Sequence, residues 1–315
     1  MALKSMLGLC GQDVHYKYLL DCSIDPHLQP TAAIQRTEPN RTSTIGNMSS
    51  YAITGASRGI GWAFLTNLSS NPANTVIALV RNKAGTEEQI AKELAGRTNV
   101  HVVQADLDNY KTLQFAADET ARITGGGLDY LIANAAFVET WDLYDPIGVF
   151  FPSPPLNRNS ANNHPQQTNG GKQVPELEDN LLKNFKTNVI ALTSAHSDIE
   201  LVRTLGMANA PSYAIGKAGL NMAIAKFGAQ YASEGVLFLA ICPGLVDTGH
   251  FEGMSEHQQA AAQAMFAKFK EYSPRFNGAR PADDSVRDIL SVIENATVEK
   301  NGGDFLSHKG SKTWI

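Results

Sequence analysis

The stretch MSSYAITGASRGIGWAF, residues 48–64, decides the fold of this chain. Its apolar beginning, Tyr51–Ile53, is typical of a short buried strand, and the residues after its last glycine are typical of a helix. Gly55, Gly59 and Gly61 lie at the junction of the two. Glycine permits a tight turn and a close approach of the backbone, and the free N–H groups at a helix start attract anions. The stretch therefore predicts a strand, a turn and a helix that bind the pyrophosphate of a dinucleotide.

Apolar, β-rich segments alternate with amphipathic segments along the rest of the chain. This alternation predicts a parallel sheet that is covered by helices on both faces. We therefore expect an α/β fold of the Rossmann type, with a doubly wound parallel sheet and three layers (α/β/α). The expected strands are Tyr51–Ile53, Thr75–Val80, Val100–Gln104, Leu128–Ala133, Val189–Thr193, Val236–Ile241 and a short one near Asp304–Leu306. The expected helices cover about residues 60–70, 86–95, 109–124, 176–188, 211–233, 254–271 and 282–296.

The composition of the 315-residue chain argues against several classes of protein. A net charge of −5 gives no electrostatic reason to expect nucleic acid or an anionic membrane as a partner. No apolar run reaches the roughly 18 residues that span a bilayer. Cys10, Cys22 and Cys242 have no metal-type spacing and are typical of a reducing compartment. We expect a cytoplasmic protein with no metal site and with neither nucleic acid nor membrane as a partner.

Two arginines indicate which nucleotide binds. In an NAD site, an acidic side chain after the second strand usually binds the ribose 2′-hydroxyl. Here that strand ends in Arg81-Asn82, and Arg58 lies among the glycines. Because arginine pairs with a 2′-phosphate that an acid would repel, the sequence predicts NADPH. The alternative for Arg81 is a solvated arginine at the end of a strand. Asp106, after the third strand, either contacts the adenine edge or is the N-cap of the next helix.

Tyr213 and Lys217 are candidates for the chemistry. They are four residues apart in an expected helix, which places both side chains on one face. An ammonium beside a phenol stabilises the phenolate, so we expect the pKa of Tyr213 to be lowered. A tyrosine of this kind is a plausible general acid for a carbonyl oxygen.

Six motifs make the sequence similar to a known family, the single-domain short-chain dehydrogenases/reductases. In detail the chain resembles fungal carbonyl reductases, including ketoreductases of aromatic-polyketide pathways, over about residues 48–315. The motifs are TGASRGIG (54–61), ANAA (133–136), KTNV (186–189), TSAHSDIE (193–200), YAIGK (213–217) and CPGLVDT (242–248).

The resemblance implies a role for each matching position. Tyr213 would protonate the substrate oxygen, Lys217 would bind the nicotinamide ribose and tune Tyr213, and Ser194 would hydrogen-bond the substrate carbonyl. Asn188 would hold a water in the proton relay, and Asn134 would stabilise the central strand beside the cofactor. The positions implied to contact the cofactor are Gly55, Ser57, Arg58, Gly59, Ile60, Gly61, Arg81, Asp106, Asn134, Tyr213, Lys217, Pro243, Gly244, Val246 and Thr248.

Two segments lie outside the pattern of this family. We expect residues 1–47 to be a disordered N-terminal extension of a single NAD(P)-binding domain, 48–315. Residues 150–174 are rich in Pro, Asn, Gln, Ser and Gly, which predicts a loop insertion.

The segment between Asn188 and Ser194 is unusually short for the family. Only six positions separate the two residues, so the crossover near residue 189 is shortened. Either the preceding helix unwinds early or the strand is poorly formed. Our hypothesis for all three departures is a gene model with an upstream start, a retained intron and a skipped stretch. The rival hypothesis is a genuine but altered enzyme, with residues 150–174 as a substrate lid.

The function that the sequence predicts is the NADPH-dependent reduction of a ketone or aldehyde to an alcohol. A hydrophobic or aromatic carbonyl compound of fungal secondary metabolism is the expected substrate, with Phe137, Trp141 and Tyr144 either in its pocket or in the core. One alternative is a catalytically impaired NADP-binding protein or redox sensor, and another is an NAD-linked alcohol dehydrogenase. Members of the family form homodimers or homotetramers, and the shortened crossover predicts weaker association here.

Overall fold

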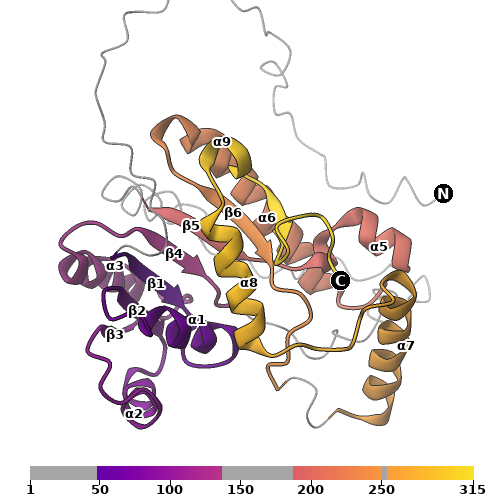
Figure 1. The fold of residues 1–315 in the computed structure, drawn as a ribbon, viewed down its shortest axis with the longest axis horizontal. Helices are drawn as coiled ribbons and strands as arrows, with labels where there is room; N and C mark the ends of the chain where they lie inside the picture. The colour runs from indigo at the N-terminus through magenta and orange to yellow at the C-terminus, as the bar shows by residue number, and fades with distance from the viewer. Residues whose placement is uncertain (1–47, 137–186, 250–253) are drawn as a thin grey trace, which may run out of the picture. The chain divides into compact units, whose positions relative to one another are not determined.

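The structure is a computed structural model that describes residues 48–136, 187–249 and 254–315 (Figure 1). The expected extension 1–47 and insertion 150–174 lie outside the described residues. So do Phe137, Trp141 and Tyr144, and all but the last two positions of the helix expected at 176–188. These expectations therefore stay predictions.

Seven parallel strands form one sheet in the order β3-β2-β1-β4-β5-β6-β7. The sheet confirms the predicted Rossmann-type fold. Its strand order reverses between β1 and β4, and ligands of such sheets bind at this reversal, beyond the carboxyl ends of the strands. The strands are β1 (Ser50–Thr54), β2 (Thr75–Val80), β3 (Val100–Gln104), β4 (Tyr130–Ala133), β5 (Asn188–Leu192), β6 (Phe238–Cys242) and β7 (Phe305–Ser307).

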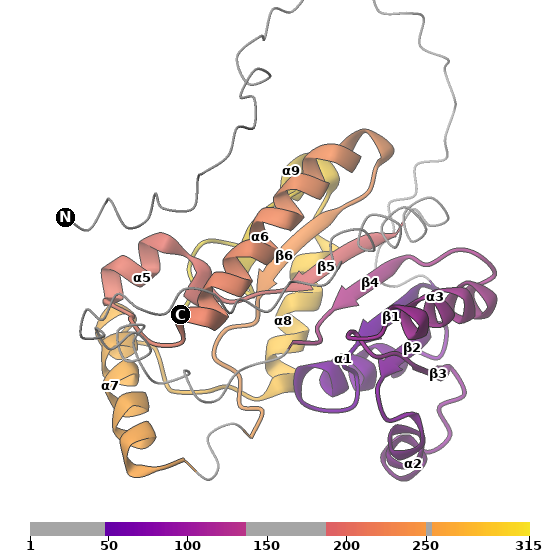
Figure 2. The same cartoon turned by 180° about the vertical axis from the view of Figure 1, so that it is seen from behind.

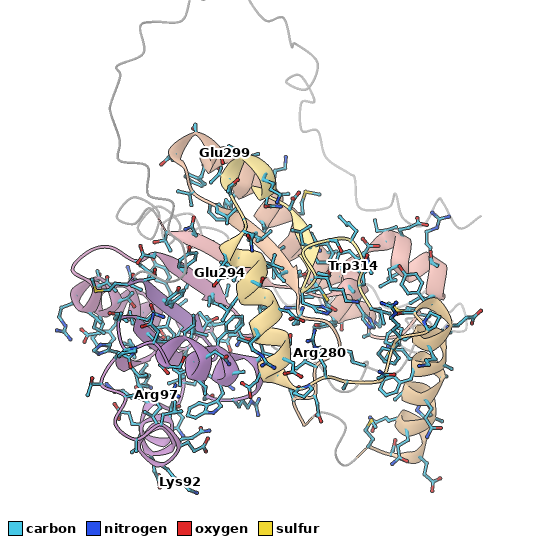
Figure 3. All side chains as sticks on the ribbon, viewed as in Figure 1. Lys92, Arg97, Arg280, Glu294, Glu299 and Trp314 are labelled. Atoms are coloured by element: carbon cyan, nitrogen blue, oxygen red, sulfur yellow. The ribbon has the colours of Figure 1, made fainter. Side chains whose placement is uncertain are left out.

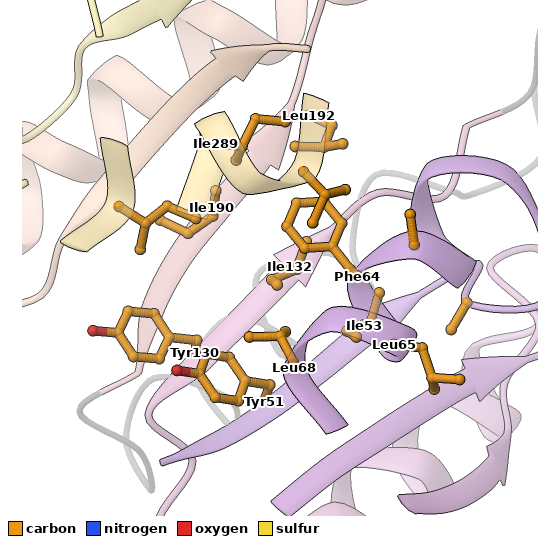
Figure 4. Close-up of a cluster of buried hydrophobic side chains, with 14 of the residues drawn as sticks. Tyr51, Ile53, Phe64, Leu65, Leu68, Tyr130, Ile132, Ile190, Leu192 and Ile289 are labelled. Carbon is orange, nitrogen blue, oxygen red and sulfur yellow. The ribbon is translucent and has the colours of Figure 1, made fainter. Parts of the chain in front are cut away.

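One face of the sheet packs against α1 (Gly59–Ser69) and α8 (Ala282–Glu294), which lie in front of the strands in Figure 1. Successive residues of a strand point to opposite faces, so alternate strand residues form this layer. Figure 4 shows Phe64 of α1 and Ile289 of α8 over the strands. The rings of Tyr51 and Tyr130 stack in the same layer, with centroids 5.1 Å apart. This core holds the strand that leads into the glycine turn.

The opposite face packs against α3 (Tyr110–Thr124) and α6 (Pro211–Tyr231), as Figure 2 shows from behind. Ala52 of β1 contributes to the core under α3. Ala240 of β6 and Ile224 of α6 contribute to the core under α6. The three layers place α6 directly over β5 and β6, the strands whose ends carry the other predicted site residues.

The remaining helices include pieces that the sequence did not predict. Helix α5 is one: Asp198 caps its start by accepting a hydrogen bond from Leu201 N at 2.8 Å, and Gly206 ends it in the left-handed region. These are normal start and stop signals, but the helix between them is too short for hydrophobic periodicity to detect. The remaining helices are α2 (Lys83–Glu93), η3 (Ala195–Ser197), α5 (Ile199–Leu205), η4 (Ala232–Glu234), α7 (Glu256–Tyr272) and α9 (Val298–Asn301).

Strand β5 is fully formed despite the shortened crossover. It pairs with β4 on one side and with β6 on the other, and Ile190 and Ala191 are buried. The alternative of a poorly formed strand is therefore wrong. No helix in the described parts of the chain is long and apolar enough to cross a membrane.

Candidate active site

Helix α1 begins directly after the glycine turn, with its first N–H groups uncapped. Arg58, the N-cap residue, has extended backbone, and within the described residues its side chain makes no capping hydrogen bond. The first turn carries no acidic residue. Because free N–H groups and the helix dipole favour negative charge, this helix end fits the pyrophosphate of a dinucleotide.

Close backbone packing explains why glycine is needed in the turn. A Cβ atom added at Gly61 would lie 2.3 Å from the carbonyl oxygen of Gly55 and 2.6 Å from Nδ2 of Asn134. Gly59 has a positive φ of 55°, and a Cβ there would lie 3.3 Å from Cγ2 of Thr248. The structure thus brings Thr248, far along the sequence, to the glycine turn.

Asn134 and Thr54 fasten β4 to β1 at the point where the strand order reverses. The Asn134 side chain donates from Nδ2 to the Thr54 carbonyl at 2.9 Å and to the Gly55 carbonyl at 3.3 Å. The Thr54 hydroxyl accepts hydrogen bonds from the N–H groups of Asn134 and Ala135, at 3.1 and 2.9 Å. These bonds fix the start of the glycine turn. Ser57 and Ile60 are half-buried within this turn and the helix start that follows it.

The residues expected to read the nucleotide lie at the same edge of the sheet. Arg58 and Arg81 are exposed at the ends of the neighbouring strands β1 and β2. The Asn82 side chain accepts a hydrogen bond from Gly85 N at 3.1 Å and caps α2. Asp106 is half-buried and accepts from Asp108 N at 3.2 Å. Since α3 is capped by another residue, Asn109, the alternative role of Asp106 as its N-cap is wrong.

The segment after β6 forms a second loop over the site. The Pro243 carbonyl accepts a hydrogen bond from the Ser285 hydroxyl at 2.7 Å. Val246 forms an isolated parallel bridge with Arg280, which is also ion-paired to Asp288 at 2.7 Å and is labelled in Figure 3. Gly244 has a positive φ of 81°. These contacts hold Val246 and Thr248 at the carboxyl edge of the sheet.

Ser194, Tyr213 and Lys217 come together at the junction of β5 and α6. The hydroxyl groups of Ser194 and Tyr213 are hydrogen-bonded to each other. The Lys217 ammonium donates to the Leu192 carbonyl at 2.8 Å and lies 5.8 Å from the centroid of the Tyr213 ring. Two hydroxyl groups and an ammonium at one point are suited to protonating and polarising a carbonyl oxygen.

A strained residue sets the start of α6. Ala210 is fully buried and has a φ of 52°, the only positive φ among the described non-glycine residues. Pro211 follows in the first helical turn, where its fixed φ is favourable. Left-handed backbone is costly for alanine, and such strain is found where function requires a particular geometry. This sharp turn directs the first turn of α6, including Tyr213, towards Ser194.

The pKa of Tyr213 is raised, contrary to the expectation from its spacing to Lys217. Burial of the phenol raises this pKa, and the hydrogen bond from Ser194 lowers it by less. Burial also lowers the pKa of Lys217. The Lys217 ammonium donates to a backbone carbonyl and lies over the Tyr213 ring. Burial is therefore the main influence on the pKa of Tyr213 in the protein without bound nucleotide.

Asn188 does not join this cluster. It is the first residue of β5, at the amino end of the strand, and its side chain accepts a hydrogen bond from Leu237 N at 3.1 Å. Ser194 lies beyond the carboxyl end of the same strand. Because the shortened crossover places Asn188 inside the strand, its implied role in a proton relay is not supported by the geometry.

Two residues of the cluster were missed from the sequence. His196 lies edge-on to Tyr213, with ring centroids 6.3 Å apart, and burial lowers its pKa. The thiol of Cys242 is buried and accepts a hydrogen bond from Ala195 N at 3.1 Å, and burial raises its pKa. His196 lies two residues after Ser194 and Cys242 directly before Pro243, but no spacing pattern marks either one.

Comparisons with known proteins agree with this geometry. The family described as short chain dehydrogenase matches residues 50–145. The short chain dehydrogenase virK of Hypocrea virens is 44% identical, over 85% of this chain and 100% of its own. The short-chain dehydrogenase/reductase iacC of Pestalotiopsis fici is 39% identical, with the same coverage of both chains. The chain belongs to the short-chain dehydrogenase/reductase family.

Solved structures of short-chain dehydrogenases/reductases have the same fold. NADPH-bound carbonyl reductase from chicken fatty liver has a TM-score of 0.60 at 22% identity, covering 84% of this chain and 98% of its own. A short chain dehydrogenase from Burkholderia cenocepacia in complex with NADP has a TM-score of 0.59 at 20% identity, with the same coverage. At these identities the likeness shows the fold alone.

Proposed function

We propose that this short-chain dehydrogenase/reductase uses NADPH to reduce a hydrophobic ketone or aldehyde to an alcohol. The observation that carries the proposal is the contact of Ser194, Tyr213 and Lys217 at the end of β5. These side chains come from two separate segments, and their joint position suits a carbonyl oxygen better than a purely structural role.

In the proposed reaction, the carbonyl carbon would receive a hydride from NADPH bound at the glycine turn. Tyr213 transfers its hydroxyl proton to the carbonyl oxygen, and Ser194 donates a hydrogen bond that stabilises the charge developing there. A raised pKa keeps Tyr213 protonated at neutral pH, which is the form that reduction requires. Lys217 is held by Leu192 on the face of α6 that carries Tyr213, where it would hold the nicotinamide ribose.

The exposed guanidinium groups of Arg58 and Arg81 support the choice of NADPH. No acidic residue comes directly after β2, where Arg81 and Asn82 stand instead, and the Asn82 side chain caps α2. The two arginines lie beyond neighbouring strand ends, where the ribose of a bound dinucleotide lies in this fold. A 2′-phosphate would pair with both, whereas an NAD site would offer an acid to a free hydroxyl.

The test is NADPH oxidation with a panel of aromatic and aliphatic ketones and aldehydes, using the wild type and Tyr213→Phe. The substitution removes the proton donor, so turnover should fall about 10²–10⁴-fold, while NADPH still raises the thermal unfolding temperature. Ser212→Ala, one residue away on an exposed position of α6, is the matched control and should keep its activity. Equal turnover by wild type and Tyr213→Phe would contradict the proposed mechanism.

The same measurements separate the alternatives. An NADP-binding protein without turnover would show the NADPH thermal shift and no carbonyl reduction in either variant. An NAD-linked alcohol dehydrogenase would be stabilised more by NADH than by NADPH. We also infer weaker association than is usual for the family, and light scattering that shows a stable tetramer would contradict this.

A further inference from the structure

A chain of hydrogen bonds joins α6 to the backbone of the turn that carries Ser194. The Asn221 amide donates from Nδ2 to Ser197 Oγ at 2.8 Å. Ser197 Oγ donates in turn to the Ser194 carbonyl at 2.5 Å. A serine hydroxyl has one hydrogen, and here it is used on Ser194, so Ser197 must accept from Asn221. The order of donors is therefore fixed: amide, hydroxyl, carbonyl.

Asn221 lies on the same side of α6 as the catalytic residues. It follows Lys217 by four positions and Tyr213 by eight, and residues at this spacing occupy successive turns of one helix face. The helix packs against η3, the short turn after Ser194. Helix α6, seen from behind in Figure 2, therefore holds the turn at two points: Tyr213 holds the Ser194 side chain, and Asn221 holds its backbone through Ser197.

The geometry of Asn221 is not that of a residue placed for stability alone. Its Oδ1 atom is buried and finds no hydrogen-bond partner among the described residues. A buried acceptor without a partner costs free energy, and an alanine here would avoid that cost. Asn221 keeps a buried Oδ1 atom without a partner and makes one hydrogen bond to Ser197 with its Nδ2 atom. Stability alone does not explain an asparagine at this position.

We propose that Asn221 is a positioning residue, which acts through Ser197 to hold Ser194 in line with Tyr213. The proposal rests on the proposed function, since it assigns a task to the same site. Without the amide, the Ser197 hydroxyl is free to rotate and the Ser194 carbonyl keeps only the backbone N–H of Ser197, at 3.0 Å, as a partner. The Ser194 hydroxyl, which still accepts from His196 N at 3.3 Å, is then held less firmly towards Tyr213. The transition state would then lose an aligned donor, while the nucleotide site at the glycine turn would keep its contacts.

The first experiment measures kcat, KM and NADPH affinity for Asn221→Ala, Ser197→Ala and the double variant. Each single variant should lower kcat about 10–100-fold, the range for a misplaced catalytic group, with NADPH affinity unchanged. The double variant should be no slower than the slower single variant, because both cut the same chain of bonds. Ser197→Thr keeps a hydroxyl and should restore kcat.

Asn74→Ala is the matched control for a structural asparagine. Asn74 is buried at the amino end of β2, at the opposite edge of the sheet, where its Nδ2 donates to the Leu68 carbonyl at 2.9 Å. Asn74→Ala should lower the unfolding temperature and leave kcat unchanged. Asn221→Ala should lower kcat and leave the unfolding temperature unchanged. Full kcat in Asn221→Ala, or a kcat that falls only in step with stability, would overturn the proposal.

Crystal structures separate a failure of this proposal from a failure of the proposed function. If the wild type reduces no carbonyl compound, the proposed function fails, but the position of Ser194 can still be observed. The distance between the Ser194 and Tyr213 hydroxyl oxygens should be longer in Asn221→Ala than in the wild type. An unchanged distance would overturn the positioning role, whatever the activity.

Discussion

The glycine turn, residues 55–61, and the proposed catalytic corner, where Ser194, Tyr213 and Lys217 meet, are built in different ways. At the glycine turn, backbone packs on backbone: Gly61 has no room for a side chain because the Gly55 carbonyl lies against it. At the catalytic corner, side chains from distant segments hold the geometry, as Lys217 does on Leu192 and Cys242 on Ala195. The glycine turn depends on the absence of side chains, and the catalytic corner depends on contacts that side chains make with distant parts of the backbone.

This difference predicts which changes each region tolerates. A region of close backbone packing should fail when an atom is added, because the backbone has no rotamer by which to yield. A region of side-chain contacts should fail when atoms are removed, because cavities and unpaired groups remain.

The largest expected effect is from Trp314→Ala. Trp314 is buried, stacks on Phe305 with ring centroids 4.5 Å apart, and belongs to the core beneath the catalytic corner (Figure 3). Its removal should cost about 3–5 kcal/mol of unfolding free energy in a urea titration. Phe115→Ala, which removes an exposed ring from α3, should change it by less than about 0.5 kcal/mol. A similar cost for both would show that the side-chain core does not support the corner.

Gly61→Ala tests the other region by adding one methyl group. The new Cβ would meet the Gly55 carbonyl at 2.3 Å, so the turn or α1 must shift, at a cost of about 3 kcal/mol, and NADPH binding should be lost. Gly216→Ala makes the same change in α6, where no described atom lies within 4 Å. It should stabilise the helix by up to about 1 kcal/mol. Urea titration of both variants would decide, and a tolerated Gly61→Ala would refute tight packing at the turn.

The double variant Arg58→Ser/Arg81→Ser tests whether side-chain contacts also decide which nucleotide binds at the carboxyl edge of the sheet. Each lost charge-assisted bond to a 2′-phosphate is worth about 1.5–3 kcal/mol, so the loss of both should weaken NADPH binding at least about a hundredfold. NADH affinity should stay unchanged. Lys92→Ser removes one exposed positive charge on the nearby α2 and shows how much the loss of a charge outside the phosphate site matters (Figure 3). Equal loss of both nucleotides in a calorimetric titration would argue against phosphate recognition.

The smallest expected effect is a pH dependence from His308. Its ring lies beside Gly244, and its Nδ1 atom is buried without a hydrogen-bond partner among the described residues. Burial lowers the pKa of His308 to about 4, the charges of Arg280 and Lys309 contribute to this, and Asp288 opposes it. The unfolded chain binds this proton near pH 6.5, so stability is full above that pH and is lost as pH falls towards 4. The loss should reach about 2 kcal/mol by pH 5.

Urea titrations at several pH values would measure this dependence. His308→Gln cannot bind the proton, so its stability should fall less between pH 7.5 and 5 than that of the wild type. The same dependence of stability on pH in both proteins would mean that titratable groups other than His308 cause the loss of stability in acid. The contact of His308 with the loop after β6 would then not limit stability at low pH.

The local spacing of the sequence was enough to predict the strands, most helices and the glycine turn. Each of these depends on residues close together in the chain, as Gly55, Gly59 and Gly61 are. Helix α5 escaped because seven residues give too little periodicity. Asn188 was misplaced because its implied role came from a family pattern whose intervening segment is shorter here, and the pairing of β5 then fixed it at the amino end of the strand.

The sequence by itself determined the parallel sheet, the anion-binding helix start and the helical pair Tyr213 and Lys217, since hydrophobic period and glycine spacing are local properties. Only the tertiary structure decided that the pKa of Tyr213 rises, that Ser194 bonds to it, and that Asn221 reaches the Ser194 turn. Burial and contacts between segments some 20 or more residues apart produce these features. Such properties belong to the packed chain and to no stretch of it alone.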